Sequence, residues 1–274
     1  MKGLKPSLLA LCVAGMPAAA LAEIQPLDEA SMGNITGQSG VTIELEAKIN
    51  IDKFIYTDDG SLEINDIFIG GGNRTDYFPE LGFNLTGNGI GPTDRIDNVR
   101  INIDIASDGD AIINILPIVF GAVDFTVTTG AWNLVDTGGT PGTTLIDNFR
   151  MDALIGSGTI RIDTATDKMN IKTDFAIDDM DFDVPFLGIG IRDFQLTGPD
   201  YDLQAPQPLR LFANVDMDIY QGPNQAGVDS LAVDLNNFEA DIRIGGVLIG
   251  GTSIGSVAID NLAITDTKLR IYGH

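Results

Sequence analysis

The sequence predicts an all-β protein, built mostly from antiparallel strands that bend along their length. Three observations lead to this prediction: strict alternation of apolar and polar residues, repeated Asp/Asn pairs that interrupt the alternation, and scarce helical periodicity. A β-sandwich, a curled sheet and an irregular β-roll all satisfy these observations, so the sequence leaves the choice among the three open.

The alternation is clearest between Val41 and Asp52, where every odd-numbered residue is apolar and every even-numbered residue is polar or charged. The segments 99–105 and 215–220 repeat the pattern. Successive side chains of a strand point to opposite faces, so each segment predicts a strand with one dry and one solvated face. Such strands are typical of antiparallel sheets.

Pairs of residues that are mostly Asp or Asn recur along the chain, and the apolar residues before and after each pair are three positions apart. In a straight strand, this odd spacing would put the two apolar residues on opposite faces. A straight strand would turn its second half to the wrong face. Asp and Asn tolerate left-handed backbone geometry, so each pair predicts a bulge, a bend or a tight turn. The alternative is that such pairs are simply common in an Asp-rich chain. The apolar residues that precede the seven pairs are Ile64, Ile96, Ile146, Ile177, Ile191, Leu235 and Ile259.

Composition narrows the classes of function. The 274 residues carry 39 acidic and 16 basic side chains, and the net charge of −23 disfavours binding to nucleic acid or anionic lipid surfaces. Hydrophobic residues make up 44% of the chain, which excludes general disorder, and aromatic residues make up 7%, which disfavours an outer-membrane barrel. The only histidine is His274 and the only cysteine is Cys12, so we predict that the chain is not an enzyme.

The first 22 residues have the pattern of a cleaved signal peptide. A basic start precedes an apolar stretch over residues 8–21, and small residues occupy positions Ala20 and Ala22. A membrane anchor is the alternative, disfavoured because a spanning helix needs roughly 20 apolar residues. We therefore predict export to the periplasm, the outer membrane or the cell surface. Cleavage would remove Cys12, which leaves no thiol for a disulfide.

The rest of the chain is predicted to divide into a flexible N-terminal segment, residues 23–40, and a β domain, residues 41–274. The proline-rich stretch 198–208 predicts a boundary if the β domain has two lobes. Residues 36–40 predict a flexible hinge that leads into the first long strand. This suggests the hypothesis that the strand pairs with the sheet edge of another chain.

Two segments resemble a poorly characterised family of secreted gammaproteobacterial proteins, some of which carry pilus-system labels. Residues 27–41 follow the pattern L-D-x-x-x-M-x-x-x-T-G-Q-x-G-V, and residues 259–274 end in Tyr272-Gly273-His274. The resemblance implies an envelope or surface location, and it implies no catalytic residues.

Carboxylates are the side chains that remain for a charged binding site. Asp179, Asp181 and Asp183 alternate with apolar residues and so share one face of a strand, and Asp216 and Asp218 do the same. Adjacent acids repel each other, which raises their pKa or recruits a cation, and calcium suits such oxygen ligands. The alternative is a solvated acidic face without an ion. No other cofactor is predicted.

Two functions stay open. The first is a non-enzymatic envelope or surface protein with a structural or interaction role, associated with a pilus system, whose partners are other envelope proteins or further copies of itself. The second is a periplasmic or outer-membrane-associated module that binds a lipid or another hydrophobic ligand. Residues 111–123, the most apolar stretch after the signal peptide, predict either a buried strand pair or an apolar wall of such a groove.

Overall fold

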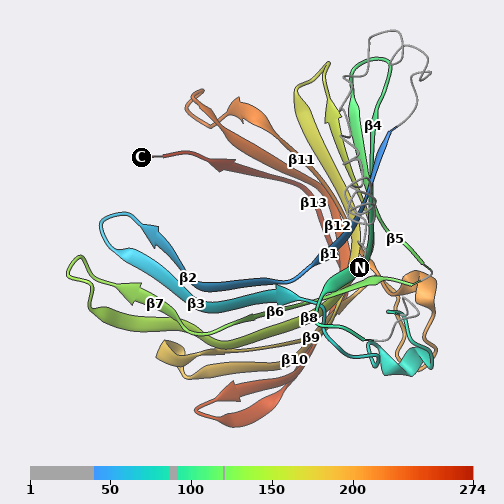
Figure 1. Cartoon of the computed structure of the whole chain (residues 1–274). Coiled ribbons are helices and arrows are strands. Elements are labelled where there is room, and N and C mark those ends of the chain that lie inside the picture. The colour runs from blue at the N-terminus through green and yellow to red at the C-terminus, as the bar shows by residue number, and fades with distance from the viewer. Residues whose placement is uncertain (1–39, 87–91, 120, 274) are drawn as a thin grey trace, which may run out of the picture. The chain divides into compact units, whose positions relative to one another are not determined.

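Thirteen strands and three short 3₁₀ helices make up the part of the chain that the structure, a computed structural model, describes: residues 40–86, 92–119 and 121–273 (Figure 1). The all-β prediction is confirmed, and the strand pairings are antiparallel. The predicted signal peptide and residues 23–39 lie outside the described residues. Within these residues, no helix is long and apolar enough to cross a membrane.

The strands differ widely in length, and the four longest bend in their middle. The short and medium strands are β1 (Val41–Ala47), β2 (Ile49–Thr57), β3 (Ser61–Gly70), β4 (Ile96–Ile105), β5 (Ala111–Pro117), β6 (Val123–Thr129), β7 (Trp132–Val135), β10 (Ile189–Thr197) and β11 (Ala213–Pro223). The long strands are β8 (Pro141–Asp163), β9 (Lys168–Val184), β12 (Asp229–Ile249) and β13 (Thr252–Ile271). The helices are η1 (Pro79–Leu81), η2 (Pro185–Leu187) and η3 (Pro208–Arg210).

The bends of the long strands divide one sheet into two arms. The first arm has the order β1-β4-β5-β8-β9-β11-β12-β13, and the second has the order β2-β3-β6/β7-β8-β9-β10-β12-β13. The long strands pass through both arms, and Figure 1 shows the sheet folding over at this common hinge. Of the three predicted architectures, the described residues therefore adopt the curled sheet.

The Asp/Asn pairs lie at irregularities of the strands, as their spacing predicted. In five pairs the second residue has a positive φ of 49–58°, the left-handed region that Asp and Asn tolerate: Asp66, Asn98, Asn148, Asp193 and Asn261. The other two pairs, residues 178–179 and 236–237, lie where the register with a neighbouring strand shifts. These irregularities keep the apolar residues before and after each pair on the same face of the sheet.

Two apolar clusters lie on opposite faces of the sheet near the hinge. On the concave face, Ala153, Ile177 and Leu196 form the centre of one cluster with Ala213 and Ala240. On the convex face, strand residues pack against two loops, residues 71–86 and 198–212. This convex cluster contains Tyr77, Phe78, Leu85, Ala122, Leu154, Ala176, Tyr201 and Leu211.

The proline-rich stretch 198–208 belongs to the convex packing. Tyr201 is 1% exposed, its ring meets Phe78 edge-on at 6.2 Å, and its hydroxyl donates a hydrogen bond to Glu80 at 2.9 Å. Arg243 donates a hydrogen bond to the Tyr201 carbonyl at 2.9 Å. This stretch thus connects the loop 71–86 to the sheet. Strands β9 and β12 continue through both arms of the sheet.

Candidate functional site

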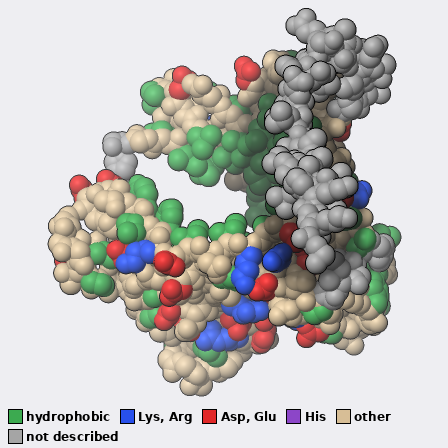
Figure 2. Space-filling view, in the orientation of Figure 1, with side chains coloured by type: hydrophobic (Ala, Val, Ile, Leu, Met, Phe, Trp, Pro, Cys, Tyr) green, Lys and Arg blue, Asp and Glu red, His purple; other side chains and the backbone are tan. Residues whose placement is uncertain are grey.

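The concave face of the sheet is an apolar trough, and it is the first candidate site. Strand pairing places apolar side chains side by side across the first arm. One row runs from one sheet edge to the other through the apolar residues Val41, Ile103, Ile113, Ile160, Ile171, Met217 and Leu235, and it ends at the polar Thr267. Figure 2 shows hydrophobic side chains lining the hollow between the arms.

The second arm carries aromatic side chains on the same face. The rings of Trp132 and Phe149 lie 6.4 Å apart, and those of Phe149 and Phe182 lie 6.5 Å apart. At the hinge the rings of Phe175 and Phe238 stack at 6.5 Å. Aromatic rings offer large apolar areas with little rotamer freedom to lose on binding. The trough therefore has a continuous apolar lining through both arms.

Much of this lining is open to solvent. Sixteen of the large hydrophobic side chains that are exposed project from the concave face: Val41, Ile43, Leu45, Ile49, Ile51, Phe54, Tyr56, Ile105, Leu134, Ile162, Leu231, Ile249, Val257, Ile259, Leu269 and Ile271. The largest apolar patch of a typical soluble monomer covers only about 300–600 Å², and larger ones mark interaction or ligand sites. An open apolar trough of this extent is a candidate binding site.

The apolar stretch 111–123 contributes one wall of the trough through β5. Ala111, Ile113 and Ile115 project from the concave face between β4 and β8, whereas Asn114 projects from the other face and accepts a hydrogen bond from Thr159 at 3.0 Å. Further along, Ala122 belongs to the convex cluster. The stretch therefore contributes to both faces, and β5 supplies the part that reaches the trough.

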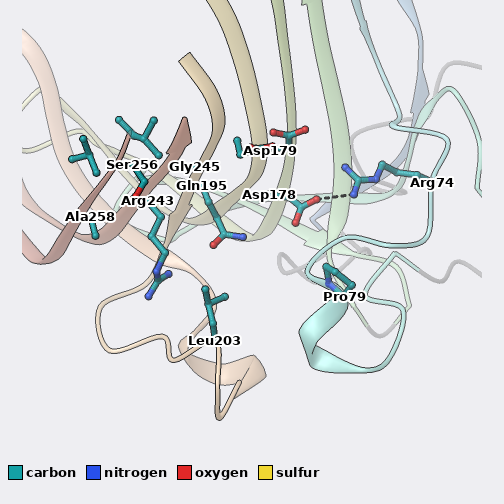
Figure 3. Close-up of a pocket in the computed structure, with 13 residues that line it drawn as sticks. Arg74, Pro79, Asp178, Asp179, Gln195, Leu203, Arg243, Gly245, Ser256 and Ala258 are labelled. Atoms are coloured by element: carbon teal, nitrogen blue, oxygen red, sulfur yellow. Dashed lines mark ion pairs between the residues drawn. The ribbon is translucent and has the colours of Figure 1, made fainter. Parts of the chain in front are cut away.

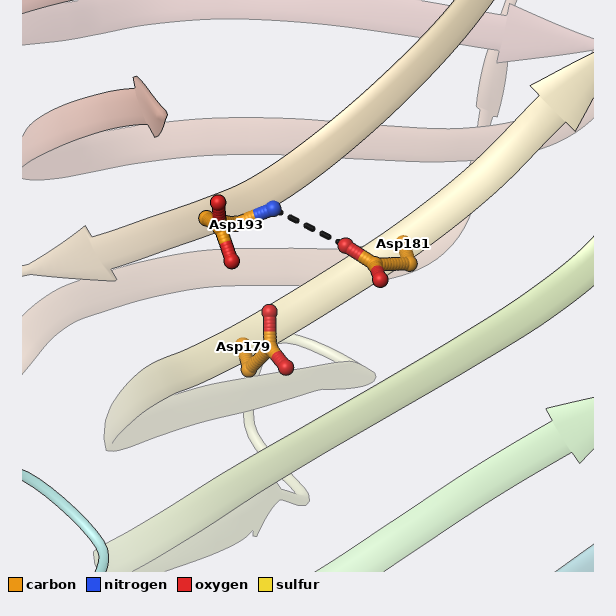
Figure 4. A group of neighbouring side chains, drawn as sticks. All are labelled: Asp179, Asp181 and Asp193. Carbon is orange, nitrogen blue, oxygen red and sulfur yellow. Dashed lines mark hydrogen bonds between the residues drawn. The ribbon is translucent and has the colours of Figure 1, made fainter. Parts of the chain in front are cut away.

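An acidic group on the convex face is the second candidate site (Figure 4). Asp179, Asp181 and Asp193 each bring a carboxylate oxygen within 4.8 Å of the other two. The backbone N–H of Asp193 donates a hydrogen bond to Asp181 at 2.8 Å. One oxygen of Asp179 is buried without a hydrogen-bond partner among the described residues. Oxygen ligands in this arrangement have the chemistry to hold a hard cation such as calcium.

Burial and the neighbouring carboxylates raise the pKa of Asp179 to about 6. Burial is the largest cause, and the charges of Asp181 and Asp193 add to it. Sequence reasoning identified Asp179 and Asp181 but missed Asp193, which belongs to the neighbouring strand β10. The only available signal was the Arg192-Asp193 pair, which predicted a bend and gave no information on which strand would lie beside it.

The other predicted calcium ligands lie apart from this group and have their own partners. Asp183 accepts hydrogen bonds from Asn148 at 3.0 Å and Arg192 at 2.6 Å, and the Asn148 bond, with Arg192 adding to it, lowers its pKa. In the first arm, Asn170 donates hydrogen bonds to both Asp216 and Asp218. Lys172 lies 3.0 Å from Asp216, and Lys168 lies 3.7 Å from Asp218. The structure therefore distributes the five predicted ligands over three places.

A pocket of about 520 Å³ lies beside the acidic group, between the sheet and the convex loops (Figure 3). Arg74 forms an ion pair with Asp178 at 2.9 Å, and Asp178 also accepts a hydrogen bond from the Phe78 backbone at 2.9 Å. The lining combines Arg74 and Arg243 with three carboxylates, so its charges largely offset one another. Its ion pair and hydrogen bonds fix the loop 71–86 to the hinge.

The fold and the trough together define an all-β protein with an open apolar surface on the concave face of its sheet. Residues 1–107 are similar to a family that is described as "Family of unknown function (DUF6160)", and this match reaches from the N-terminus to just beyond β4. No curated protein and no solved structure matches the chain. The similarity therefore assigns no activity, and the case for a function rests on the site itself.

Proposed function

We propose that the chain binds a hydrophobic ligand with a long apolar chain in the concave trough. The observation that carries this proposal is the continuous apolar lining of one face through both arms. Covering apolar surface stabilises a complex by about 25 cal/mol per Å², so an open lining of this size offers a large driving force for binding. This favourable free energy has to offset the entropy that the ligand loses when it becomes ordered in the trough.

The chemistry of the lining indicates which part of a ligand it would contact. The side chains of Ile, Val, Met and Phe offer no hydrogen-bonding groups. A polar group of the ligand would lose its hydrogen bonds to water there without a replacement, so we expect the bound part of the ligand to be apolar. A polar head group would remain at the mouth of the trough. The trough spans eight strands, and at about 4.8 Å per strand its floor is roughly 34 Å long, which suits an extended chain.

The predicted export supports the same proposal. A signal peptide would place the trough in an aqueous compartment beside a membrane, where a hydrophobic compound needs a cover in order to leave the lipid phase. The envelope location and the absence of enzymatic activity stay predictions from the sequence.

Two adjacent residues on opposite faces of β4 provide a matched test. Ile101 projects into the trough, and Asn102 projects from the convex face and accepts a hydrogen bond from Thr42 at 3.0 Å. Ile101→Asp places a carboxylate in the apolar lining, and we expect affinity for the neutral fluorescent probe phenylnaphthylamine to fall about tenfold or more. Asn102→Asp keeps the hydrogen-bond acceptor, and we expect it to leave the affinity unchanged.

A fluorescence titration of the two variants and the parent protein checks this expectation, with far-UV circular dichroism as the control for folding. Equal probe affinity in all three folded proteins would mean that the probe binds outside the trough. The absence of saturable binding to the parent protein would remove the support for a ligand trough.

An interaction role is the second candidate, and the open edges of the sheet favour it. Both ends of the strand order are free among the described residues, and exposed strand edges promote pairing with another chain. These edges carry the inference that follows.

A further inference from the structure

We propose that copies of this chain associate edge to edge, with β1 and β2 of one copy beside β13 of the next, so that their troughs join. This inference concerns the two edges of the sheet, whose concave side chains also belong to the rim of the trough, and it holds whether or not the trough binds a ligand. It rests on the strand edges, their direction, the side chains along them and their charge.

The two edges of the sheet are unpaired within the described part of the chain. There, β1 pairs with β4, β2 pairs with β3, and β13 pairs with β12, and none of the three has a strand on its other side. Neither edge contains a proline, the residue that most directly blocks pairing. Their outward N–H and C=O groups are therefore available to another strand.

The direction of the edge strands matches the pairing pattern of the sheet. From β1 to β2 the chain runs from the tip of the first arm to the hinge and then along the second arm. Strand β13 runs the opposite way, from the second arm through the hinge to the first arm. A second copy that continues the sheet therefore brings the two edges together antiparallel, as in the strand pairs within the chain.

Apolar side chains on both edges remain exposed in a single copy. Ile43 and Leu45 on β1 are 41% and 37% exposed, and Leu269 and Ile271 on β13 are 53% and 51% exposed. All four project from the concave face. Pairing with Ile43 opposite Ile271 and Leu45 opposite Leu269 would cover them and continue the apolar lining from one copy into the next.

The same register pairs opposite charges on the convex face. Glu44 would face Arg270 and Glu46 would face Lys268. Within one copy Glu46 forms an exposed ion pair with Arg95 at 3.1 Å, and Arg270 pairs with Asp234 at 2.6 Å. A net charge of −23 opposes the association of identical chains, so two basic side chains opposite two acidic ones matter for this contact.

The contact joins two different edges, and this determines the form of the assembly. Head-to-tail contacts of this type generate rings or open chains of copies rather than closed two-fold dimers. We therefore expect species larger than dimers as the protein concentration rises.

Sedimentation velocity of the full chain over a range of concentrations tests the proposal through a charge swap. Lys268→Glu or Glu46→Lys alone puts like charges opposite each other, and we expect each to weaken association about three- to tenfold. The double variant restores opposite charges and should recover association. Arg210→Glu reverses a charge on η3, away from both edges, and should leave association unchanged.

Each outcome decides the proposal. Larger species that weaken in both single variants and return in the double variant support it. A protein that stays monomeric, forms only dimers, or associates equally well in every variant overturns it, provided that thermal unfolding shows the variants to be folded. Phenylnaphthylamine binding per copy, measured on the same samples, shows separately whether the ligand proposal stands.

Discussion

The two faces of this sheet use the same strands for different purposes. On the convex face, loops cover the hinge, ion pairs fix these loops, and residues such as Leu154 are fully buried. On the concave face, only the hinge residues are covered, and the apolar lining of both arms is open. The difference indicates that the convex face supplies stability and that the concave face is shaped for something outside the chain.

If the convex face carries the stability, truncating one residue on each face should give very different losses. Leu154→Ala leaves a cavity in the convex cluster, and we expect the free energy of unfolding to fall by about 2–5 kcal/mol. Leu269→Ala removes a half-exposed side chain of the trough, and we expect a loss below about 1 kcal/mol. Urea unfolding followed by circular dichroism measures both, and similar losses would contradict the comparison.

The ion pairs of the convex face give the next largest effect. Arg74 pairs with Asp152 at 3.3 Å and Asp178 at 2.9 Å, and these carboxylates are 3% and 6% exposed. Arg74→Ala leaves both without this partner, and we expect a loss of roughly 2–3 kcal/mol. Arg95→Ala breaks only the exposed pair with Glu46 and should cost less than about 1 kcal/mol. An equal effect of the two variants in urea unfolding would show that Arg74 does not fix the hinge.

The acidic group of the convex face should make stability depend on pH. The pKa of Asp179 rises from an ordinary 3.8 to about 6 in the folded protein, so this carboxyl holds its proton more tightly when folded. Its contribution to stability is therefore lost as the pH rises from about 4 to about 6. We expect Asp179→Asn to stabilise the protein by about 1–2 kcal/mol near neutral pH and to have little effect near pH 4.

Unfolding of the parent protein and Asp179→Asn over this pH range measures the effect. A variant that is less stable than the parent at neutral pH would mean that the charged carboxylate has a favourable partner. Adding calcium to the parent protein at neutral pH distinguishes an ion from a solvated face, because an ion bound to the folded state raises the unfolding temperature.

The smallest expected effect concerns the bends that keep the apolar residues on the concave face. Asn261 has a φ of 55°, which glycine adopts freely and alanine adopts at a cost. We expect Asn261→Ala to cost about 1 kcal/mol and Asn261→Gly to change stability by less than this. Thermal unfolding of the pair checks the prediction, and indistinguishable variants would argue against a left-handed bend at this position.

Sequence reasoning found the local features of this fold and missed the features that depend on distant contacts. Residue parity predicted the bend at Asn261 and the single apolar face of β1, because both follow from the two-residue period of a strand. It could not choose the curled sheet, since the pairing of β1 with β4 depends on contacts far apart in the sequence. It also missed the loop 71–86, whose packing against Tyr201 and Asp178 has no periodic signal.

For the candidate sites too, the sequence predicted the local features and not those that depend on distant contacts. The alternation of Asp179 with Asp181 placed both on one strand face, but only the pairing of β9 with β10 brought Asp193 beside them. Residues 111–123 were apolar enough to suggest a groove wall, yet the trough itself arises because the four long strands β8, β9, β12 and β13 bend together and carry the shorter strands with them. A property of one strand is visible in the sequence, whereas a surface shared by many strands is not.

Photo-crosslinking with a diazirine-bearing fatty alcohol tests the ligand trough most directly. After illumination, peptide mapping by mass spectrometry locates the label on the sheet. We predict saturable labelling of concave residues, including Ile113 and Ile160, and no labelling of Asn114 and Thr159 beside them on the convex face. Labels on the convex face, or labelling that does not saturate, would contradict a ligand site in the trough.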